Sequence, residues 1–157
     1  MRYEKRDITT VQAPGIISHG VNCQNVMGSG VAKALFTKWP KVKSEYHKHQ
    51  PEHGYHQGST LLGSVQFVVI EPGLIVANCF TQEYYGRDFG KRYADPRAVY
   101  ECLEEVASYA RTEWGLNEVH MPRIGCGLGG LDWEEDVVPS LESIEWEWPI
   151  DFVVCDV

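Results

Sequence analysis

The chain has 157 residues, 43% of them hydrophobic, and its 22 acidic and 14 basic side chains give a formal net charge of -8. No apolar run approaches the ~20 residues that span a bilayer, so we expect one soluble globular domain over residues 1–157 and no membrane association. The acidic balance argues against general nucleic-acid binding, because neutralising phosphates requires a basic face.

Two further features predict a cytoplasmic protein. Residues 1–7 are too polar for a secretory signal. The five cysteines are odd in number, widely spaced and never in a C-x-x-C pair, so we expect reduced thiols that are mostly buried. They are Cys23, Cys79, Cys102, Cys126 and Cys155.

The N-terminal part of the chain predicts two strands, a loop and a helix. Residues 1–10 are short and polar-rich, typical of an edge strand, and residues 16–21 form an apolar run of buried-strand length. Residues 22–30 are polar and contain glycine, which indicates a loop. In residues 31–39 apolar side chains recur at helical spacing, and Pro40 limits the helix.

A histidine-rich stretch follows. Residues 41–49 predict a polar helix and residues 51–58 a loop. The stretch invites a metal-site interpretation, but its spacing matches no established ligand pattern and no cysteine or carboxylate set completes it, so we predict no metal. Its histidines are His47, His49, His53 and His56.

The middle of the chain predicts a β-hairpin and an unusual loop. Residues 60–71 and 74–80, separated by Pro72-Gly73, form the hairpin, and both strands are predicted to be buried on both faces. Residues 81–94 interleave aromatic and basic side chains, which suits a ligand with a flat ring and phosphates; a solvated loop fixed to the core by its aromatics explains the pattern equally well. The side chains are Tyr84, Tyr85, Arg87, Phe89, Lys91, Arg92 and Tyr93.

Helix signals are strongest near the C-terminus. Asp95-Pro96 supplies a cap and a first-turn proline for a helix that reaches Trp114 and ends at Gly115. Residues 118–124 and 150–157 predict the last two strands. Between them Pro139 prevents an uninterrupted helix from Asp132.

A glycine-rich loop follows the strand at residues 118–124. It contains Gly125, Gly127, Gly129 and Gly130, which can take positive φ angles and direct several N–H groups into one concavity for a phosphate. Asp132 is a candidate cap for the helix behind it. A tight strand-to-helix connection is the alternative. With residues 16–39, this gives two strand–loop–helix units whose loops could face one another across a crevice.

Three segments in family order resemble the macrodomain, an ADP-ribose-binding module: Arg6-Asp7-Ile8-Thr9, residues 22–32 and residues 121–133. The resemblance implies an α/β fold, a three-layer α/β/α sandwich around a mixed, mostly parallel sheet of about six strands. It is greatest to the branch with the yeast ADP-ribose-1''-phosphate phosphatase, the terminal ADP-ribose protein glycohydrolase and the antitoxin that reverses DNA ADP-ribosylation. The implied ligand is ADP-ribose or a derivative, without a cofactor or metal.

The resemblance also implies site residues. Asp7 and the backbone of Ile8 would bind adenine, while a turn cap is the alternative for Asp7. Asn22 would adjoin the distal ribose, with an Asx-turn as its alternative. The ribose would further contact Met27, Gly28, Ser29, Gly30 and Val31, and the diphosphate Gly125, Cys126, Gly127, Leu128, Gly129 and Gly130.

Departures from the family pattern bear on the reaction. Glycohydrolase-like relatives use a lysine where this chain has Gln82, which cannot form a Schiff base, and the protein-directed glycohydrolase has an aspartate where this chain has Gly129. Removal of ADP-ribose by the lysine-dependent mechanism and by the aspartate-dependent mechanism is therefore doubtful.

His19 resembles a histidine of the yeast phosphatase. An imidazole titrating near pH ~6.5 could act as base, acid or nucleophile on a phosphomonoester, so we predict His19 and Asn22 as catalytic residues. A core histidine beside the loop is the alternative. The predicted reaction is metal-free hydrolysis of the terminal phosphate of ADP-ribose-1''-phosphate. A non-catalytic ADP-ribose reader or scavenger and a de-ADP-ribosylating hydrolase remain alternatives.

Overall fold

The computed structural model describes residues 1–49, 60–88 and 90–157. Six strands form one sheet in the order β1-β6-β5-β2-β4-β3, in which only β3 pairs antiparallel to its neighbour. The strands are β1 (Arg2–Lys5), β2 (Gly15–Asn22), β3 (Val65–Glu71), β4 (Leu74–Gln82), β5 (Glu118–Met121) and β6 (Asp151–Asp156).

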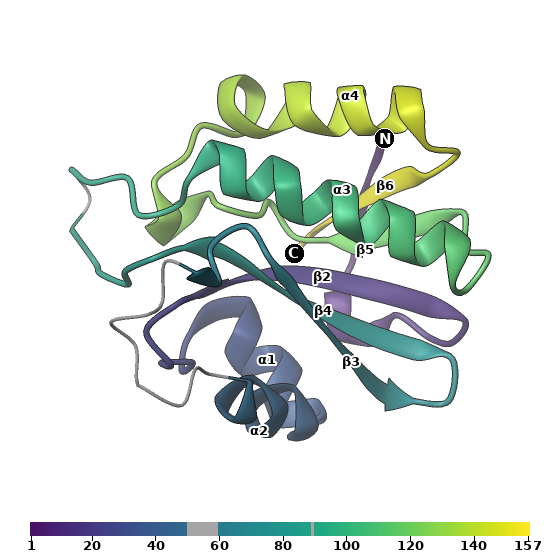
Figure 1. Ribbon diagram of the computed structural model, residues 1–157, viewed down its shortest axis with the longest axis horizontal. Helices are drawn as coiled ribbons and strands as arrows, with labels where there is room; N and C mark the ends of the chain where they lie inside the picture. The colour runs from purple at the N-terminus through teal and green to yellow at the C-terminus, as the bar shows by residue number, and fades with distance from the viewer. Residues whose placement is uncertain (50–59, 89) are drawn as a thin grey trace.

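Helices cover both faces of this sheet (Figure 1). In the figure α3 and α4 lie above the sheet, whereas α1 and α2 lie below the part formed by β2, β4 and β3. The predicted three-layer sandwich around a mixed, mostly parallel sheet is therefore confirmed. The helices are α1 (Gly30–Lys38), α2 (Lys41–Lys48), α3 (Pro96–Thr112) and α4 (Val138–Glu147).

Two apolar clusters fill the space between the layers. Above the sheet, Ile75 of β4 packs in one cluster with Val106 of α3 and Leu141 of α4. Below it, Phe80 of β4 packs with Leu35 and Tyr46 from α1 and α2. Because successive strand residues point to opposite faces, the apolar side chains of β4 contribute to both clusters. Packing on both faces fixes the position of the carboxyl end of this strand.

The predictions for the strands need three corrections. β3 is not buried on both faces, because it is an edge strand, and its Val69 is 40% exposed. It begins at Val65 rather than at residue 60, since residues 61–63 form a turn. β5 ends at Met121 rather than at residue 124, directly before Pro122, which has no N–H for the ladder. The predicted hairpin itself is confirmed.

Predictions from capping residues are confirmed. The Asp95 side chain accepts a hydrogen bond from the backbone N–H of Arg97 at the start of α3. Asp132 accepts from the N–H of Glu135 at the start of a π-helical turn, Trp133–Val137. This turn separates Asp132 from α4, whose first turn contains Pro139, as expected for a residue that cannot continue a helix.

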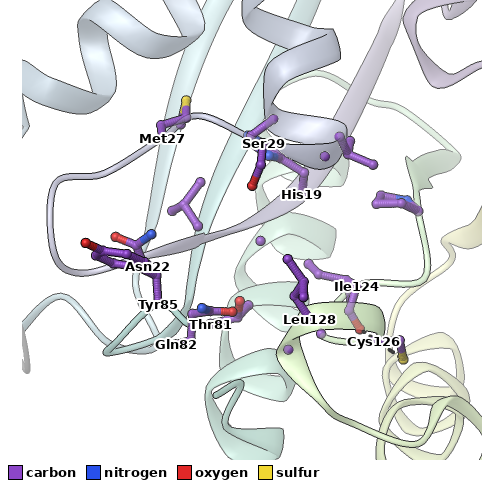
Figure 2. Close-up of a pocket in the computed structure, with 18 of the residues that line it drawn as sticks. His19, Asn22, Met27, Ser29, Thr81, Gln82, Tyr85, Ile124, Cys126 and Leu128 are labelled. Atoms are coloured by element: carbon purple, nitrogen blue, oxygen red, sulfur yellow. Dashed lines mark hydrogen bonds between the residues drawn. The ribbon is translucent and has the colours of Figure 1, made fainter. Parts of the chain in front are cut away.

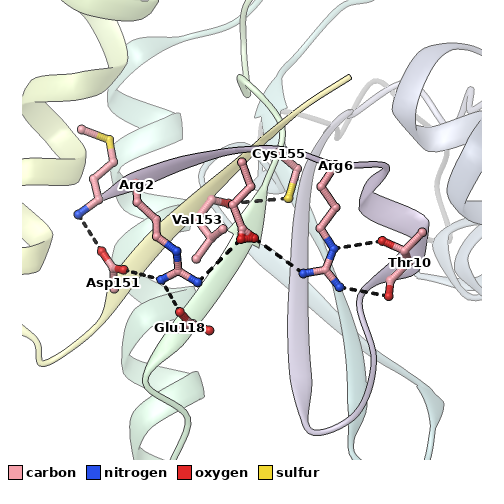
Figure 3. A network of polar contacts seen from close by, with 9 residues as sticks. Arg2, Arg6, Thr10, Glu118, Asp151, Val153 and Cys155 are labelled. Carbon is pink, nitrogen blue, oxygen red and sulfur yellow. Dashed lines mark hydrogen bonds and ion pairs between the residues drawn. The ribbon is translucent and has the colours of Figure 1, made fainter.

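The edge strand β1 is held by a polar network (Figure 3). The Arg2 guanidinium pairs with Glu118 of β5 and, at 2.8 Å, with Asp151 of β6. Arg6 donates to the Thr10 hydroxyl at 2.9 Å and to the Thr10 carbonyl at 3.0 Å. These contacts hold the turn that follows β1. The sheet order confirms the predicted edge strand, but the strand spans Arg2–Lys5 rather than residues 1–10, since Ile8–Thr10 form a 3₁₀ turn.

The cysteines and histidines can be placed in part. All five thiols are free, and only Cys126 among them is not fully buried. His47 contacts Asn25 and the His49 ring stacks on Phe80 at 5.8 Å between ring centroids, whereas His53 and His56 lie outside the described residues. The described part of the chain contains no group of three His, Cys, Asp or Glu side chains that could hold a metal ion. None of its helices is long and apolar enough to cross a membrane.

Candidate functional site

A cavity of about 520 Å³ opens at the carboxyl ends of β2, β4 and β5. Its wall combines the two predicted glycine loops with the segment after β4. Figure 2 shows Met27 and Ser29 at the top of the cavity, Cys126 and Leu128 at the lower right, and Tyr85 at the left. Ligands of open α/β sheets bind in such a crevice, and the volume suits a small organic molecule.

The loop that follows β2 is organised by Asn22. Asn22 Oδ1 accepts a hydrogen bond from the Gln24 N–H at 2.9 Å, and Asn22 Nδ2 donates to the Val26 carbonyl at 2.8 Å. The Tyr46 hydroxyl adds contacts to Asn22 Oδ1 and to its carbonyl. The side chain therefore makes the Asx-turn that we gave as the alternative, and it lines the cavity while shaping the loop.

The start of α1 also lines the cavity. A Cβ added to Gly28 would have no atom within 4 Å, and the φ angle of this residue is not in the left-handed region. The fold itself therefore does not require glycine there. Ser29 occupies the N-cap position without a side-chain cap hydrogen bond. The first N–H groups of α1 are therefore available to an anion at the positive end of the helix dipole. Five predicted residues line the cavity here: Met27, Gly28, Ser29, Gly30 and Val31.

The second loop is shaped by its glycines. Gly125, Gly127 and Gly130 have φ angles of 79°, 70° and 80°, which other residues rarely adopt. The carbonyl of Gly129 accepts hydrogen bonds from the N–H groups of residues 93 and 94, which anchor the loop. A Cβ at Gly130 would lie 2.5 Å from the Lys91 carbonyl oxygen, so close packing also requires glycine there. The tight-connection alternative thus explains part of this loop.

The predicted diphosphate residues divide into two groups. Gly125, Cys126, Leu128 and Gly129 line the cavity, whereas Gly127 and Gly130 are absent from its wall in the described residues. Burial raises the pKa of the Cys126 thiol to about 11, so it is protonated at neutral pH and a poor nucleophile.

His19 is among the residues that line the cavity, but its side chain is almost completely buried. Its side chain is 1% exposed, and its Nε2 lies 2.5 Å from Oδ1 of Asn78 on β4. Burial lowers its pKa to about 4, although the hydrogen bond to Asn78 opposes the shift. The expected titration near pH 6.5 is therefore wrong, because burial disfavours the charged imidazolium and lowers the pKa of the ring. Nδ1 is buried without a partner in the described residues, and a catalytic role for His19 stays a prediction.

Asp7 and Ile8 lie outside the cavity wall that the described residues form. Asp7 Oδ1 accepts from the Thr9 N–H at 2.9 Å and from the Thr9 hydroxyl at 2.8 Å, which caps the short turn Ile8–Thr10. These bonds lower the pKa of the Asp7 carboxyl. The turn-cap alternative therefore describes its contacts, while its predicted role toward adenine is untested.

The end of β4, the segment after it and the segment after β5 supply wall residues that sequence reasoning did not assign to the site. The aromatic and basic pattern of residues 81–94 suited a ligand and a solvated loop equally, and it did not indicate which side chains reach the cavity. The side chain of Gln82 donates to the Tyr84 carbonyl at 2.8 Å. No sequence signal distinguished Thr81. The unassigned wall residues include Thr81, Gln82, Tyr85, Arg87 and Arg123.

The charge of the wall differs from that of the chain. Among the described residues, the wall contains no aspartate or glutamate, whereas the chain has 22 acidic side chains. Its basic side chains are Arg87 and Arg123. Arg123 makes a bidentate ion pair with Asp156, with N–O distances of 3.0 and 3.1 Å. Arg87 forms no ion pair in the described part of the chain. The cavity therefore favours an anionic ligand.

The sequence of the chain is similar to a known domain family and to individual proteins of other organisms. It matches the Macro domain family over residues 18–138. It is 32% identical to an uncharacterised 17.5 kDa protein of Enterobacteria phage T4, over 94% of this chain and 97% of that protein. It is 30% identical to an ADP-ribose 1''-phosphate phosphatase of Meyerozyma guilliermondii, over 86% of this chain and 89% of that protein.

Solved structures agree with the fold. A macrodomain protein of Streptomyces coelicolor is 28% identical, with a TM-score of 0.75 over 99% of this chain and 97% of that one. Thermosipho africanus DarTG in complex with ADP-ribose is 17% identical, with a TM-score of 0.72 over 96% of this chain and 40% of that one, and this likeness concerns the fold alone.

Proposed function

Because the chain belongs to the Macro domain family, we propose that it binds ADP-ribose and hydrolyses the terminal phosphate of ADP-ribose 1''-phosphate. The observation that carries the proposal is the charge of the cavity wall. In a chain of net charge -8, a wall with arginine and free N–H groups but no carboxylate among the described residues is matched to phosphates.

The shape of the cavity supports an extended nucleotide ligand. The diphosphate would lie against the loop at residues 125–129, and the distal ribose against residues 27–31 at the start of α1. Both segments offer backbone N–H groups, and Gly28 leaves open space for close approach. The cavity of about 520 Å³ is within the ~300–1,000 Å³ typical of small-molecule sites.

The side chains present favour attack at phosphorus over glycosidic cleavage. Gln82 offers no amine for a Schiff base, and Gly129 offers no carboxylate. Without a carboxylate in the described wall, the paired acid and base of glycoside hydrolysis are missing. Similarity to a protein named ADP-ribose 1''-phosphate phosphatase points the same way.

The reaction needs little covalent chemistry from the protein. A water molecule attacks the terminal phosphorus, the bond between phosphorus and the ribose 1'' oxygen breaks, and the products are inorganic phosphate and ADP-ribose. The loop N–H groups stabilise the charge that develops on the phosphate oxygens. His19, neutral with its proton on Nε2, has a lone pair on Nδ1 that can accept a proton of the water, while the departing ribose 1'' oxygen takes up a proton to form the hydroxyl of ADP-ribose.

The burial of His19 also favours a second candidate, a non-catalytic reader of ADP-ribose. A ring that is 1% exposed requires some rearrangement before it can contact a water in the cavity. The Cys126 thiol is protonated at neutral pH and supplies no alternative nucleophile. Binding would then be the whole function of the same cavity.

One experiment separates the two functions. Phosphate release is measured with ADP-ribose 1''-phosphate, and release of ADP-ribose with a panel of its derivatives including O-acetyl-ADP-ribose. ADP-ribose binding is measured by calorimetry on the same protein. Phosphate release supports the phosphatase. Tight binding without turnover of any derivative supports the reader, and absence of both contradicts the proposed function.

A further inference from the structure

We infer that Arg87 binds the terminal phosphate of the ligand and thereby sets a preference for phosphate-terminated over hydroxyl-terminated ADP-ribose. The inference rests on the proposed function. Arg87 lies outside both glycine loops and is not one of the predicted catalytic residues.

Among the described residues of the cavity wall, Arg87 is the cation that no carboxylate neutralises. Of the two wall arginines, Arg123 is neutralised by Asp156 and its guanidinium lies 5.3 Å from the Tyr3 ring centroid. Arg87 has no carboxylate within ion-pair distance among the described residues, and the neighbouring Asp88 pairs with Lys91 at 3.9 Å instead. Its charge is therefore available to a ligand.

The backbone around Arg87 is held from two sides. The N–H of Tyr85 donates to Oε1 of Gln24, in the loop after β2, at 2.9 Å. The N–H of Asp88 donates to the Tyr93 hydroxyl at 3.2 Å. Gly86, which lies between Tyr85 and Arg87, packs against the Tyr93 ring so closely that an added Cβ would lie 2.3 Å from that ring. These contacts position the Arg87 backbone beside the cavity and limit the entropy lost on binding.

The chemistry of the terminal group explains why this cation matters. A phosphomonoester adds about 1.5 to 2 negative charges at neutral pH and three acceptor oxygens. Backbone N–H groups are neutral dipoles, so a second dianionic group in an acidic protein needs a compensating cation. A guanidinium donates two parallel hydrogen bonds to one phosphate, which a point charge on lysine cannot reproduce.

Binding to matched variants tests the inference. Calorimetry compares ADP-ribose with a phosphonate analogue of ADP-ribose 1''-phosphate, in which carbon replaces the bridging oxygen so that it is not hydrolysed. We expect wild-type protein to bind the analogue ~10-fold or more tightly than ADP-ribose. Arg87→Gln should remove most of this preference while changing the Kd for ADP-ribose less than ~3-fold, and Arg87→Lys should restore part of it.

The control is Lys33→Gln, which removes one positive charge from an exposed position outside the described cavity wall. It should leave the preference unchanged. An equal preference in wild type and Arg87→Gln, or an equal loss in Lys33→Gln, overturns the inference alone, since ADP-ribose still binds. No binding of ADP-ribose by wild-type protein overturns the proposed function and this inference with it.

Discussion

Nε2 of His19 on β2 lies 2.5 Å from Oδ1 of Asn78, the residue that faces it in the parallel ladder with β4. Asn78 Nδ2 donates to Oε1 of Gln66 at 3.0 Å, so its oxygen is the acceptor and His19 is the donor. This pair fixes the proton of a neutral imidazole on Nε2 and leaves Nδ1 as the basic atom. The predictions for stability and for catalysis both start from that state.

The free energy of unfolding should fall when the protein is acidified. In the unfolded chain His19 titrates near its ordinary 6.5, but in the fold its pKa is about 4. Between these values the unfolded state binds a proton that the folded state does not, so stability is full above pH ~6.5 and is lost as the pH falls toward ~4. The loss reaches about 3 kcal/mol, measured by urea unfolding at several pH values.

His19→Gln is the matched variant for this pH dependence, because its amide can still donate to Asn78. The slope of stability against pH should become shallower. Part of it should remain, since burial also lowers the pKa values of His47 and His120. An unchanged slope would show that His19 is not the titrating group.

Catalysis by His19 predicts an unusual pH profile. Its acid limb should have a midpoint near 4 rather than near 6.5, because the base is active only when unprotonated. His19→Gln should lower phosphate release ~100-fold while leaving the Kd for ADP-ribose nearly intact. Wild-type turnover in this variant would place the catalyst elsewhere.

Gly28 should affect ligand binding without affecting folding. Its added Cβ would meet no atom, so Gly28→Ala and Gly28→Leu should unfold at nearly the wild-type temperature. The larger side chain projects into ligand space, and ADP-ribose affinity should fall in that order, by ~10-fold or more for leucine. Equal affinity across the series would show that no ligand approaches this backbone.

The loop at residues 125–130 should respond according to which glycine is changed. Gly127→Val meets no atom but forces a branched residue to φ 70°, so we expect a folded protein with distorted N–H groups and weaker ADP-ribose binding. Gly130→Ala adds a clash with the Lys91 carbonyl and should lose more stability. Calorimetric affinity of Gly127→Val equal to wild type would contradict a diphosphate site here.

Asp7 carries the prediction for adenine. Asp7→Ala should lower ADP-ribose affinity ~10-fold and blur the preference for ADP-ribose over inosine diphosphate ribose, because the acceptor for the adenine amino group is lost. Thr9→Val removes the hydroxyl bond to Asp7 and keeps the carboxylate, so it controls for the turn. If Asp7→Ala keeps both affinity and discrimination, the residue is only a cap.

Much of this molecule follows from local patterns in its sequence. The two strand–loop–helix units, the caps Asp95 and Asp132 and the interruption at Pro139 depend on a few neighbouring residues, and so they could be predicted. The family resemblance extended this to the order of the segments and to the two loops. Exposure of β3 could not be predicted, because the apolar residues of an edge strand resemble those of a central one.

Only the tertiary structure determined the state of the residues that bear on chemistry. His19 is neutral because the fold buries its ring, which is 1% exposed, and the proton of that ring is positioned by Asn78, 59 positions away. Arg123 is neutralised by a carboxylate 33 positions away, whereas Arg87 meets none in the described residues. Sequence by itself supplied the residue types and the local elements. Burial and charge pairing arise from contacts between distant segments, which no local pattern encodes.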